Sequence, residues 1–443
     1  MTTHLLIQNG IALTHVAGAQ PECSHSDVLV AHARIERIER ASTAGTPSSL
    51  SVQTPAPNLS HENQQQAVTV LDAGGLFVLP GIVDLHGDAF ERQIQPRHGA
   101  VFGHDIALQD TDRQLIANGI TTACHALTYS WEGGLRGKEA AIALLHMIKL
   151  RGHFQADHRI HLRFETHHVD GLQDALDWIN QGWVDFFSFN DHLPAIARKC
   201  HLPEKLAAYA ERGRCAPSVF RQRLQHALAN AHQIGHVLEA LAQACRKQRV
   251  PMASHDDQSA HDRERFQALG ARISEFPRTQ EALDASLALH NPIIMGAPNV
   301  LLGGSHCGSI SAADAIHGGA CDILTSDYYY PSLLAAPFQL AHQGICTLTQ
   351  AWQLVSANPA QALGLGNRGR LTGGYRADLL LAESLPGGKV KLVATVAAGK
   401  LAYCSEPERL TIHAGRSGTP DIAEAAVSAA GAANQDGGYI AAA

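Results

Sequence analysis

Apolar and polar positions follow two different patterns along this chain of 443 residues. Before about residue 75, short apolar stretches predict β-strands over 4–9, 27–32 and 67–71. The stretch over 41–66 is rich in Ser, Thr, Pro, Asn and Gln, which predicts a mobile surface loop. From about residue 76 onward, short apolar runs alternate with helical patterns. The chain therefore changes its type of organisation near residue 76.

Eight apolar runs in the second part have the length of buried strands. They cover residues 77–85, 120–127, 159–165, 183–189, 249–254, 271–276, 292–296 and 321–325. Helical patterns lie between them, for example over 139–150 and in a long amphipathic segment over 218–247. Alternation of strands and helices is typical of a parallel sheet, and eight such units over roughly 250 residues predict a (β/α)8 TIM barrel.

Strand patterns return after the barrel. A helical segment over 350–364, with a break expected at Pro359, precedes strands predicted over 376–382, 390–397 and 400–403. We expect these strands to join the N-terminal ones in a small β-sandwich domain built from both chain ends. The predicted organisation assigns residues 1–75 and 366–414 to this small domain, 76–365 to the barrel and 415–443 to a flexible Gly/Ala-rich tail.

The composition excludes several classes of protein. Hydrophobic residues make up 45% of the chain, too many for a chain that is disordered throughout. There is no apolar run of transmembrane length, and the N-terminus lacks the pattern of a signal peptide. Nine scattered Cys residues do not form a disulfide framework, and a net charge of −7 gives no reason to expect nucleic-acid binding. We therefore expect a cytoplasmic enzyme with reduced thiols, whose 27 His residues need an explanation.

Candidate metal ligands follow the predicted barrel strands at their C-terminal ends, the rim where barrel enzymes have their active sites. They are His86, Asp88, Glu165, His192, His255 and Asp327, and Glu275 and His167 lie in comparable positions. Nitrogen and oxygen ligands that meet on one rim favour a divalent metal site with one or two ions. Each residue also has a plain structural interpretation, as a buried hydrogen-bonded histidine, an ion-paired carboxylate or, for Asp327, a helix N-cap.

A glycine-rich segment after the seventh predicted strand offers backbone N–H groups to an anion. Its candidate contacts are Gly303, Gly304, Ser305 and His306, although a plain turn is an equally acceptable interpretation. The position favours phosphate, because loops after strands seven and eight of barrels often bind it. Basic residues that could contribute are Arg92, Arg97, Arg136, Lys138 and Arg278, each of which could equally be a solvated surface charge. Tyr328, Tyr329 and Tyr330 either line the pocket or pack on the core.

The same segments resemble the phosphonate-utilisation branch of the amidohydrolase superfamily. The resemblance rests on LPGIVDLHGDAFERQIQPR (79–97), ASHDD (253–257), EFPRTQEA (275–282), MGAPNVLLGGSHCGS (295–309) and LTSDYYYPSLLAAPF (324–338). It extends from about residue 67 to residue 382. It implies a binuclear centre in which His86, Asp88 and Asp327 hold one ion, His192 and His255 hold the other, and Glu165 bridges them. Many relatives have a second His where this chain has Asp88.

The reaction that this resemblance implies is cleavage of the 5-triphosphate of α-D-ribose 1-methylphosphonate to the 5-phosphate and pyrophosphate. A metal-activated hydroxide would attack phosphorus, with Asp327 as general base. Zn²⁺ suits the ligand set, and Mn²⁺ and Fe²⁺ are also compatible with it. The substrate would be a small phosphorylated sugar, and a homodimer is possible. Two alternatives stay open, a hydrolase or deaminase that acts on a C–N bond of a small ring and a non-catalytic metal-binding protein.

Overall fold

The computed structural model describes residues 4–15, 20–40, 68–97, 99–151, 153–304 and 310–413. The loop predicted over 41–66, the tail predicted over 415–443, and the candidate contacts Ser305 and His306 lie outside these ranges.

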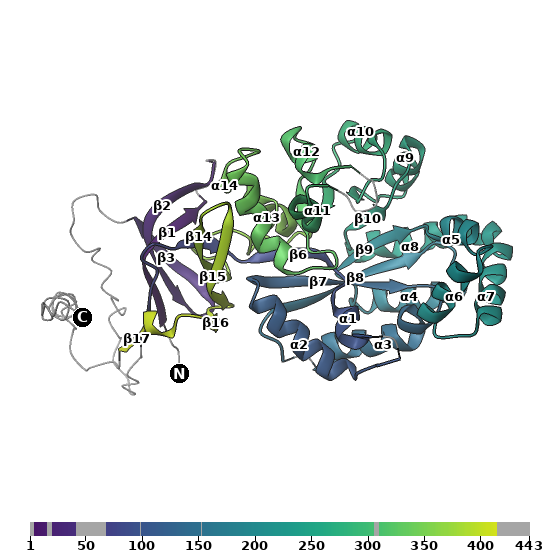
Figure 1. The fold of residues 1–443 in the computed structure, drawn as a ribbon, viewed down its shortest axis with the longest axis horizontal. Helices are drawn as coiled ribbons and strands as arrows, with labels where there is room; N and C mark the ends of the chain where they lie inside the picture. Colours follow the sequence, from purple (N-terminus) through teal and green to yellow (C-terminus); the bar gives the residue numbers. More distant parts are fainter. Residues whose placement is uncertain are drawn as a thin grey trace, which may run out of the picture.

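A parallel eight-stranded sheet forms the larger part of the molecule (Figure 1). Its strands are β6 (Ile82–Gly87), β7 (Ile120–Tyr129), β8 (Asp157–Glu165), β9 (Phe186–Asn190), β10 (Met252–His255), β11 (Ile273–Glu275), β12 (Ile293–Gly296) and β13 (Ile323–Thr325). They lie side by side in the order of the chain. A parallel bridge between Gly87 and Asp327 joins the end of the first strand to the residues after the last. The predicted TIM-barrel fold is therefore confirmed.

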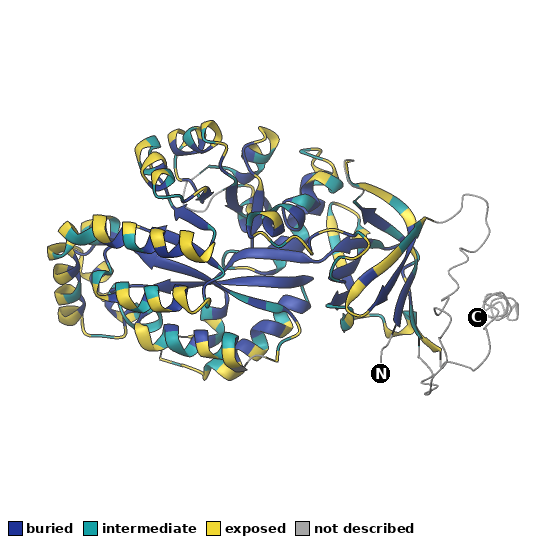
Figure 2. Cartoon of the chain, turned by 180° about the vertical axis from the view of Figure 1, so that it is seen from behind, coloured by how far each residue is buried: buried dark blue, intermediate teal, exposed yellow. Residues whose placement is uncertain are grey.

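Helices surround this sheet (Figure 1). The first half of the barrel contributes α1 (Phe90–Ile94), α2 (His104–Ile116), η1 (Gly134–Arg136), α3 (Lys138–His146), η2 (Met147–Arg151), η3 (Val169–Gly171) and α4 (Leu172–Asn180). The second half contributes α5 (Leu193–Lys199), α6 (Pro203–Arg212), α7 (Pro217–Ala229), η4 (Ala231–Gln233), α8 (Ile234–Gln248), α9 (Ala260–Ala268), α10 (Gln280–Ala288), α11 (Ala297–Leu302) and α12 (Ala312–His317). Three helices complete the barrel, α13 (Pro331–His342), α14 (Leu348–Gln353) and α15 (Ala357–Ala362). Figure 2 shows buried strands inside helices whose outer faces are exposed.

The alternation of side chains along β8 decides which residues face the inside of the barrel. Ile160, Leu162 and Phe164 belong to the apolar cluster that also contains residues of α4 and α8, so they face outward to the helices. Successive side chains of a strand point to opposite faces. Arg163 and Glu165 therefore face the interior of the barrel, where candidate ligands from the other strands also lie.

The small domain is a nine-stranded sheet assembled from both ends of the described chain. Its strands are β1 (His4–Thr14), β2 (Glu22–Ala31), β3 (Arg34–Arg40), β4 (Val68–Asp72), β5 (Phe77–Pro80), β14 (Leu379–Leu385), β15 (Lys389–Ala397), β16 (Lys400–Cys404) and β17 (Leu410–His413), and η5 (Pro407–Arg409) precedes the last of them. β1 pairs antiparallel with β2 and parallel with both β4 and β5. β5 pairs antiparallel with β14, which joins the two ends of the chain. The small domain predicted from both chain ends is thus confirmed.

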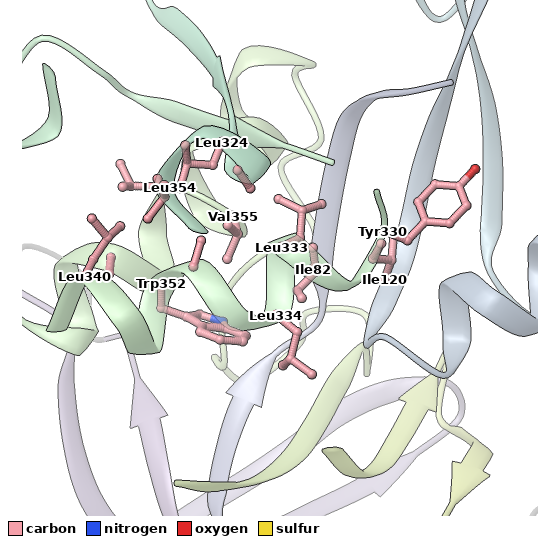
Figure 3. Packing of buried hydrophobic residues seen from close by; sticks show 14 of the residues in the cluster. Ile82, Ile120, Leu324, Tyr330, Leu333, Leu334, Leu340, Trp352, Leu354 and Val355 are labelled. Carbon is pink, nitrogen blue, oxygen red and sulfur yellow. The ribbon is translucent and has the colours of Figure 1, made fainter. Parts of the chain in front are cut away.

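A continuous apolar cluster joins the small sheet to the barrel. It combines Leu79 of β5 and Leu380 of β14 with Ile82 of β6 and with Trp352 of α14. Figure 3 shows Trp352 packed among aliphatic side chains from several elements. The indole Nε1–H of Trp352 donates to the carbonyl oxygen of Pro80 at 3.0 Å. The last residue of β5 is therefore fixed where the chain passes into the barrel.

Two of the predicted segments are divided in the structure. The single strand predicted over 77–85 is wrong, because β5 belongs to the small sheet and β6 to the barrel. The chain passes from one sheet to the other at Gly81, where a Cβ atom would collide with the Thr121 side chain. The single helix predicted over 218–247 is also wrong, because α7 ends at its C-cap Asn230 and α8 begins at Ile234.

Other differences are smaller. The helix predicted over 350–364 is divided before Ala357, and α15 runs through Pro359, so the predicted position of the break is wrong. Pro359 is tolerated because it lies in the first turn of α15, where a backbone N–H has no partner within the helix. Strands β3 and β17 were not predicted. Within the described residues, no helix combines the length and the apolar character needed to span a bilayer.

Candidate metal centre

Candidate ligands end up at one level of the barrel because of the strand register. Glu165 at the end of β8 is paired with Asn190 of β9, and Asn190 is paired with His255 of β10. His255 is in turn paired with Glu275 of β11. Parallel strands in register end at the same edge, so these four side chains form consecutive positions along the rim.

The first group of candidate ligands comes from the two strands that close the barrel. One ligand atom each from His86, Asp88 and Asp327 lies within 4.8 Å of the others. The backbone holds the group together, because the N–H of Asp88 donates to the carbonyl of Asp327 at 2.9 Å and the N–H of Asp327 donates to the carbonyl of His86 at 2.8 Å. The set predicted for one ion is therefore close enough to share that ion.

The second group contains His192, His255 and Asp256, again with one ligand atom each within 4.8 Å of the others. His192 lies at the N-terminus of α5, and its Nε2 is 3.3 Å from Oδ2 of Asp256. The ring of His255 is 5.6 Å from that of His192 and 5.5 Å from that of His86, measured between ring centroids. The two groups are therefore neighbours at the same rim.

Glu165 is fully buried and is hydrogen-bonded to the second group. Its Oε1 accepts from Nδ1 of His192 at 2.5 Å, and its Oε2 accepts from the backbone N–H of His192 at 3.2 Å. Burial alone would raise the pKa of Glu165, but the charge and hydrogen bonds of His192 outweigh it and lower the pKa. Among the described residues, Glu165 forms no hydrogen bond or ion pair with a member of the first group, so the structure links it to one of the two groups.

Glu275 contacts His86, a member of the first group. Its carboxylate accepts from Nδ1 of the buried His86 at 2.7 Å, and its other oxygen lies 3.7 Å from Nε2 of His161. The contact at Nδ1 leaves Nε2 as the nitrogen of His86 that is available to a metal ion. A carboxylate that fixes the tautomer of a histidine ligand is a common feature of metal sites.

Strained backbone occurs at three of the strand ends. Asp256, Phe276 and Asp327 follow β10, β11 and β13, and they have φ angles of 62°, 55° and 53°. Residues other than glycine rarely adopt this left-handed conformation, which costs about 1–3 kcal/mol at each position. Such strain persists where the surrounding structure holds the residue in place. Here it brings the carboxylates of Asp256 and Asp327 to the rim.

The electrostatics of the rim favour a bound cation. Burial raises the pKa of Asp327 to about 7, and repulsion from Asp88 adds to the effect. The Nδ1 of His255 and the Oε2 of Glu275 are buried, and neither has a hydrogen-bond partner among the residues that the structure describes. Neutral imidazoles and carboxylates are the donors that Zn²⁺, Mn²⁺ and Fe²⁺ accept. The residues present therefore fit a divalent metal centre.

A comparison with known protein families decides the broader identity. Residues 77–402 match the model of the amidohydrolase family. The chain belongs to the amidohydrolase family. Members of this family are hydrolases, so the chain is an enzyme, and the resemblance found in the sequence is confirmed.

Individual relatives agree with this assignment. The amidohydrolase is 35% identical over 343 residues to α-D-ribose 1-methylphosphonate 5-triphosphate diphosphatase of Escherichia coli K12, covering 76% of this chain and 90% of that relative. Its fold is similar to that of dihydropyrimidinase from Brevibacillus agri NCHU1002, with a TM-score of 0.54, 13% identity and coverage of 93% and 97% of the two chains. A Xaa-Pro dipeptidase gives a TM-score of 0.57 at 13% identity, covering 91% of this chain and 100% of the other. At such low identity, the two solved structures support the fold alone.

The predicted substrate contacts of this amidohydrolase fall into two sets. Arg278 lies near the second group, with Nη1 3.8 Å from Oδ2 of Asp256. Arg136 forms an ion pair with Glu132, in which Nη1 of Arg136 lies 3.6 Å from Oε1 of Glu132. Burial alone would lower the pKa of Arg136. The negative charges of Glu91 and Glu132 outweigh burial and raise this pKa, and Glu165 and Asp88 add smaller effects. These two cations are the predicted ones that lie close to the candidate ligands.

The other predicted contacts are placed differently. Lys138 is exposed and bonds to Asp174 at 2.6 Å on the outer side of β7. Arg92 is exposed and donates to the carbonyl of Tyr328. Arg97 is also exposed, and its backbone forms an isolated antiparallel β-bridge with Ala100. Gly303 is the C-cap of α11 and has φ 72°, and Gly304 follows it. Among the described residues, none of these forms a hydrogen bond or ion pair with a member of the ligand groups, so their proposed roles gain no support.

Several residues at the centre of this amidohydrolase were not predicted as site residues. Asp256 belongs to the second ligand group, and Arg163 lies between the two groups, 3.2 Å from His255 and 3.8 Å from Asp88. The signal for Arg163 was present, because it precedes Glu165 by two residues and so shares its face of the strand. Tyr330 is buried in the core, whereas Tyr329 is exposed.

Proposed function

We propose that this amidohydrolase is a metal-dependent diphosphatase that cleaves the 5-triphosphate of α-D-ribose 1-methylphosphonate to the 5-phosphate and pyrophosphate. The observation that carries the proposal is the 35% identity over nine-tenths of the E. coli relative named for this substrate. The two neighbouring groups of ligands, and Arg136 and Arg278 near them, support it.

In this proposal, His86, Asp88 and Asp327 hold one ion, and His192 and His255 hold the second. Asp256 is a further candidate ligand of the second ion, and Glu165 would bridge the two. The ions, when bound, would lower the pKa of water and neutralise charge on the polyphosphate. Zn²⁺ is the favoured metal, with Mn²⁺ and Fe²⁺ compatible.

The residues of the chain itself would orient the reaction. Asp327 is a carboxylate whose position is fixed by two backbone hydrogen bonds to the end of β6, so it could accept the proton of the attacking water. Arg136 and Arg278 would bind phosphate oxygens, since guanidinium groups bind phosphate in a bidentate manner. Glu275 would keep Nδ1 of His86 protonated, so that Nε2 faces the metal position.

Pyrophosphate release tests the proposal. The purified protein is loaded with Zn²⁺ or Mn²⁺, its metal content is measured, and ribosyl 5-triphosphate substrate is added. We expect equal amounts of pyrophosphate and 5-phosphate product. No pyrophosphate at full metal occupancy would contradict the proposal. Hydrolysis of hydantoin or dihydropyrimidine by the same preparation would instead support the alternative, a C–N hydrolase.

A further inference from the structure

Arg163 is a buried cation at the centre of the barrel rim. Its side chain projects from β8 on the same face as Glu165 and has 6% of its residue surface exposed. Nη2 is 3.2 Å from Nε2 of His255, and Nη1 is 3.8 Å from Oδ2 of Asp88. Asp88 belongs to the first ligand group and His255 to the second. The guanidinium therefore lies between the two groups.

The partners of this guanidinium are too few for a buried arginine. Its Nε is buried and has no hydrogen-bond partner within the described part of the chain. The ion pair with Asp88 is long, at 3.8 Å, compared with the roughly 2.7–2.9 Å of a strong charge-assisted hydrogen bond. An incompletely paired buried charge is costly, since each buried donor without a partner loses about 1–3 kcal/mol of hydrogen bonding. A residue that served only to stabilise the barrel would gain more from close pairing.

A contrast with Arg263 strengthens this point. Arg263 is also fully buried, and its Nε likewise has no hydrogen-bond partner among the described residues, but its terminal nitrogens donate to Ser254, to Asp257 at 3.3 Å and to the carbonyl of Ile273 at 3.1 Å. It therefore has the several partners that a structural arginine requires. The terminal nitrogens of Arg163 have fewer partners than those of Arg263, and each lies beside a ligand of a different group, Nη2 beside His255 and Nη1 beside Asp88.

A second arginine near the same carboxylates has a similar deficit. Arg136 has a buried Nε without a partner, and its ion pair with Glu132 is 3.6 Å long. Both arginines act on the half-buried Glu91, whose pKa is raised by desolvation in spite of their charges. Two guanidinium groups with donors to spare near the ligand groups suit an anion with several oxygens, such as a polyphosphate.

We propose that Arg163 is a phosphate-binding residue, which binds an oxygen of the substrate's polyphosphate directly beside the metal ions. This inference rests on the proposed function and adds a phosphate contact that was not among the basic residues predicted from the sequence. Lysine is a poor substitute at such a position, because an ammonium group is a point charge and cannot make two parallel hydrogen bonds. Arg163 thereby contributes to selection of an anionic substrate over a neutral cyclic amide.

The test measures binding of inorganic pyrophosphate to the metal-loaded protein by calorimetry, in the wild type and in Arg163→Met, Arg163→Lys and Arg163→Ala. Each preparation is checked for metal content and for its unfolding transition. We expect Arg163→Met to keep its metal and to bind pyrophosphate about 10- to 100-fold more weakly, as the loss of a charged hydrogen bond predicts. Arg163→Lys should recover only part of the affinity. Guanidinium ion at non-denaturing concentration should restore binding in Arg163→Ala, an effect that a purely structural role would not produce.

Arg113→Met is the matched control, since Arg113 is an exposed residue of α2 and its loss changes the net charge by the same amount. It should bind pyrophosphate like the wild type. Unchanged affinity in Arg163→Met and Arg163→Lys would overturn the inference, as would a wild type that does not bind pyrophosphate. If Arg163→Met fails to fold, the lysine variant and the guanidinium rescue decide the matter. Turnover of the triphosphate is measured separately, so an active wild type with an unaffected Arg163→Met variant refutes only the role of Arg163.

Discussion

At the scale of single residues, the contact between His86 and Glu275 is the clearest case of one side chain that prepares another. Both side chains are almost completely buried, and Nδ1 of His86 lies 2.7 Å from Oε1 of Glu275. The pair occupies the ends of β6 and β11, which are far apart in the sequence and face each other across the barrel. The orientation of His86 therefore depends on a strand that contributes no ligand to the set implied by the family.

Glu275→Gln should weaken metal binding by about 10- to 100-fold, because a glutamine no longer holds His86 with a negative charge. Chelator competition with Zn²⁺ measures this affinity without reference to turnover. Glu281→Gln, at an exposed position in the first turn of α10, is the control and should bind Zn²⁺ normally. Equal affinity in Glu275→Gln and the wild type would show that His86 does not need this carboxylate.

His255→Ala and Glu165→Ala should each lose most of the bound metal and activity while the barrel stays folded. The ring of His255 is a member of the second group, and Glu165 is the hydrogen-bond partner of His192 in that group. We expect His255→Ala to lower the metal affinity by more than about 100-fold. This loss is larger than the loss expected for a residue that only orients a metal ligand. Metal analysis after dialysis and circular dichroism check the two parts of this prediction. A fully active variant would remove that residue from the proposed centre.

At the scale of elements, a buried chain of polar groups connects α2 to two strands of the barrel. Asp112 of α2 accepts from His158 of β8 at 3.0 Å, and His158 bonds to His125 of β7 at 2.8 Å. Asp112 also accepts from the backbone N–H groups of Gln155 and Ala156, both at 3.0 Å. Burial would raise the pKa of Asp112, but these hydrogen bonds outweigh it and lower the pKa below 3.8.

Asp112→Asn should therefore lower the free energy of unfolding at neutral pH by about 1–3 kcal/mol. Because the folded-state pKa lies below the unfolded one, the stabilisation is fully present above about pH 4 and is lost as the pH falls through the folded pKa. The free energy of unfolding of variant and wild type is measured by urea unfolding at pH 7, 5 and 3.5. The difference between the two proteins should become smaller only at the lowest pH. A constant difference over the whole range would contradict the assignment to an ionised Asp112.

The barrel strands show how much of the secondary structure the hydrophobic pattern of the chain could predict. Each of the eight predicted barrel strands overlaps an observed one, because buried parallel strands have apolar runs that stand out between helices. The strand over 77–85 was predicted as a single unit, since Phe77 to Leu85 is a nearly unbroken apolar run. Its division at Gly81 depends on Thr121, which comes close only in the folded barrel. The pattern within one segment could not contain that contact.

At the scale of the whole molecule, the apolar cluster around Trp352 makes the barrel and the small sheet interdependent. Trp352 has no exposed surface, and its indole donates to Pro80 at the end of β5. Arg368 adds a polar connection, since it donates to Asp157 at the start of β8 at 2.5 Å and to Thr122 of β7 at 3.0 Å. The barrel and the small sheet are therefore in contact both through the apolar cluster and at the end of the barrel opposite the metal ligands.

Trp352→Phe should reduce the free energy of unfolding by about 1–3 kcal/mol, because the buried carbonyl of Pro80 loses its partner and the smaller ring leaves space. Zn²⁺ affinity at 25 °C should stay at the wild-type value, since the ligands lie at the other end of the strands. Thermal unfolding and chelator competition measure the two quantities. Reduced metal affinity in a folded Trp352→Phe would show that the junction affects the rim directly.

The sequence by itself determined the fold class and the candidate ligands at the strand ends, because strand periodicity and ligand chemistry are local properties that a short segment displays. Only the tertiary structure decided which ligands share a group. It brought Asp256 beside His192, attached Glu165 to that histidine, and placed Arg163 between the two groups. It also paired Lys138 with Asp174 and not with a candidate ligand. These outcomes depend on strand register, on left-handed backbone at Asp256 and Asp327, and on contacts between residues far apart in the chain, which no local pattern records.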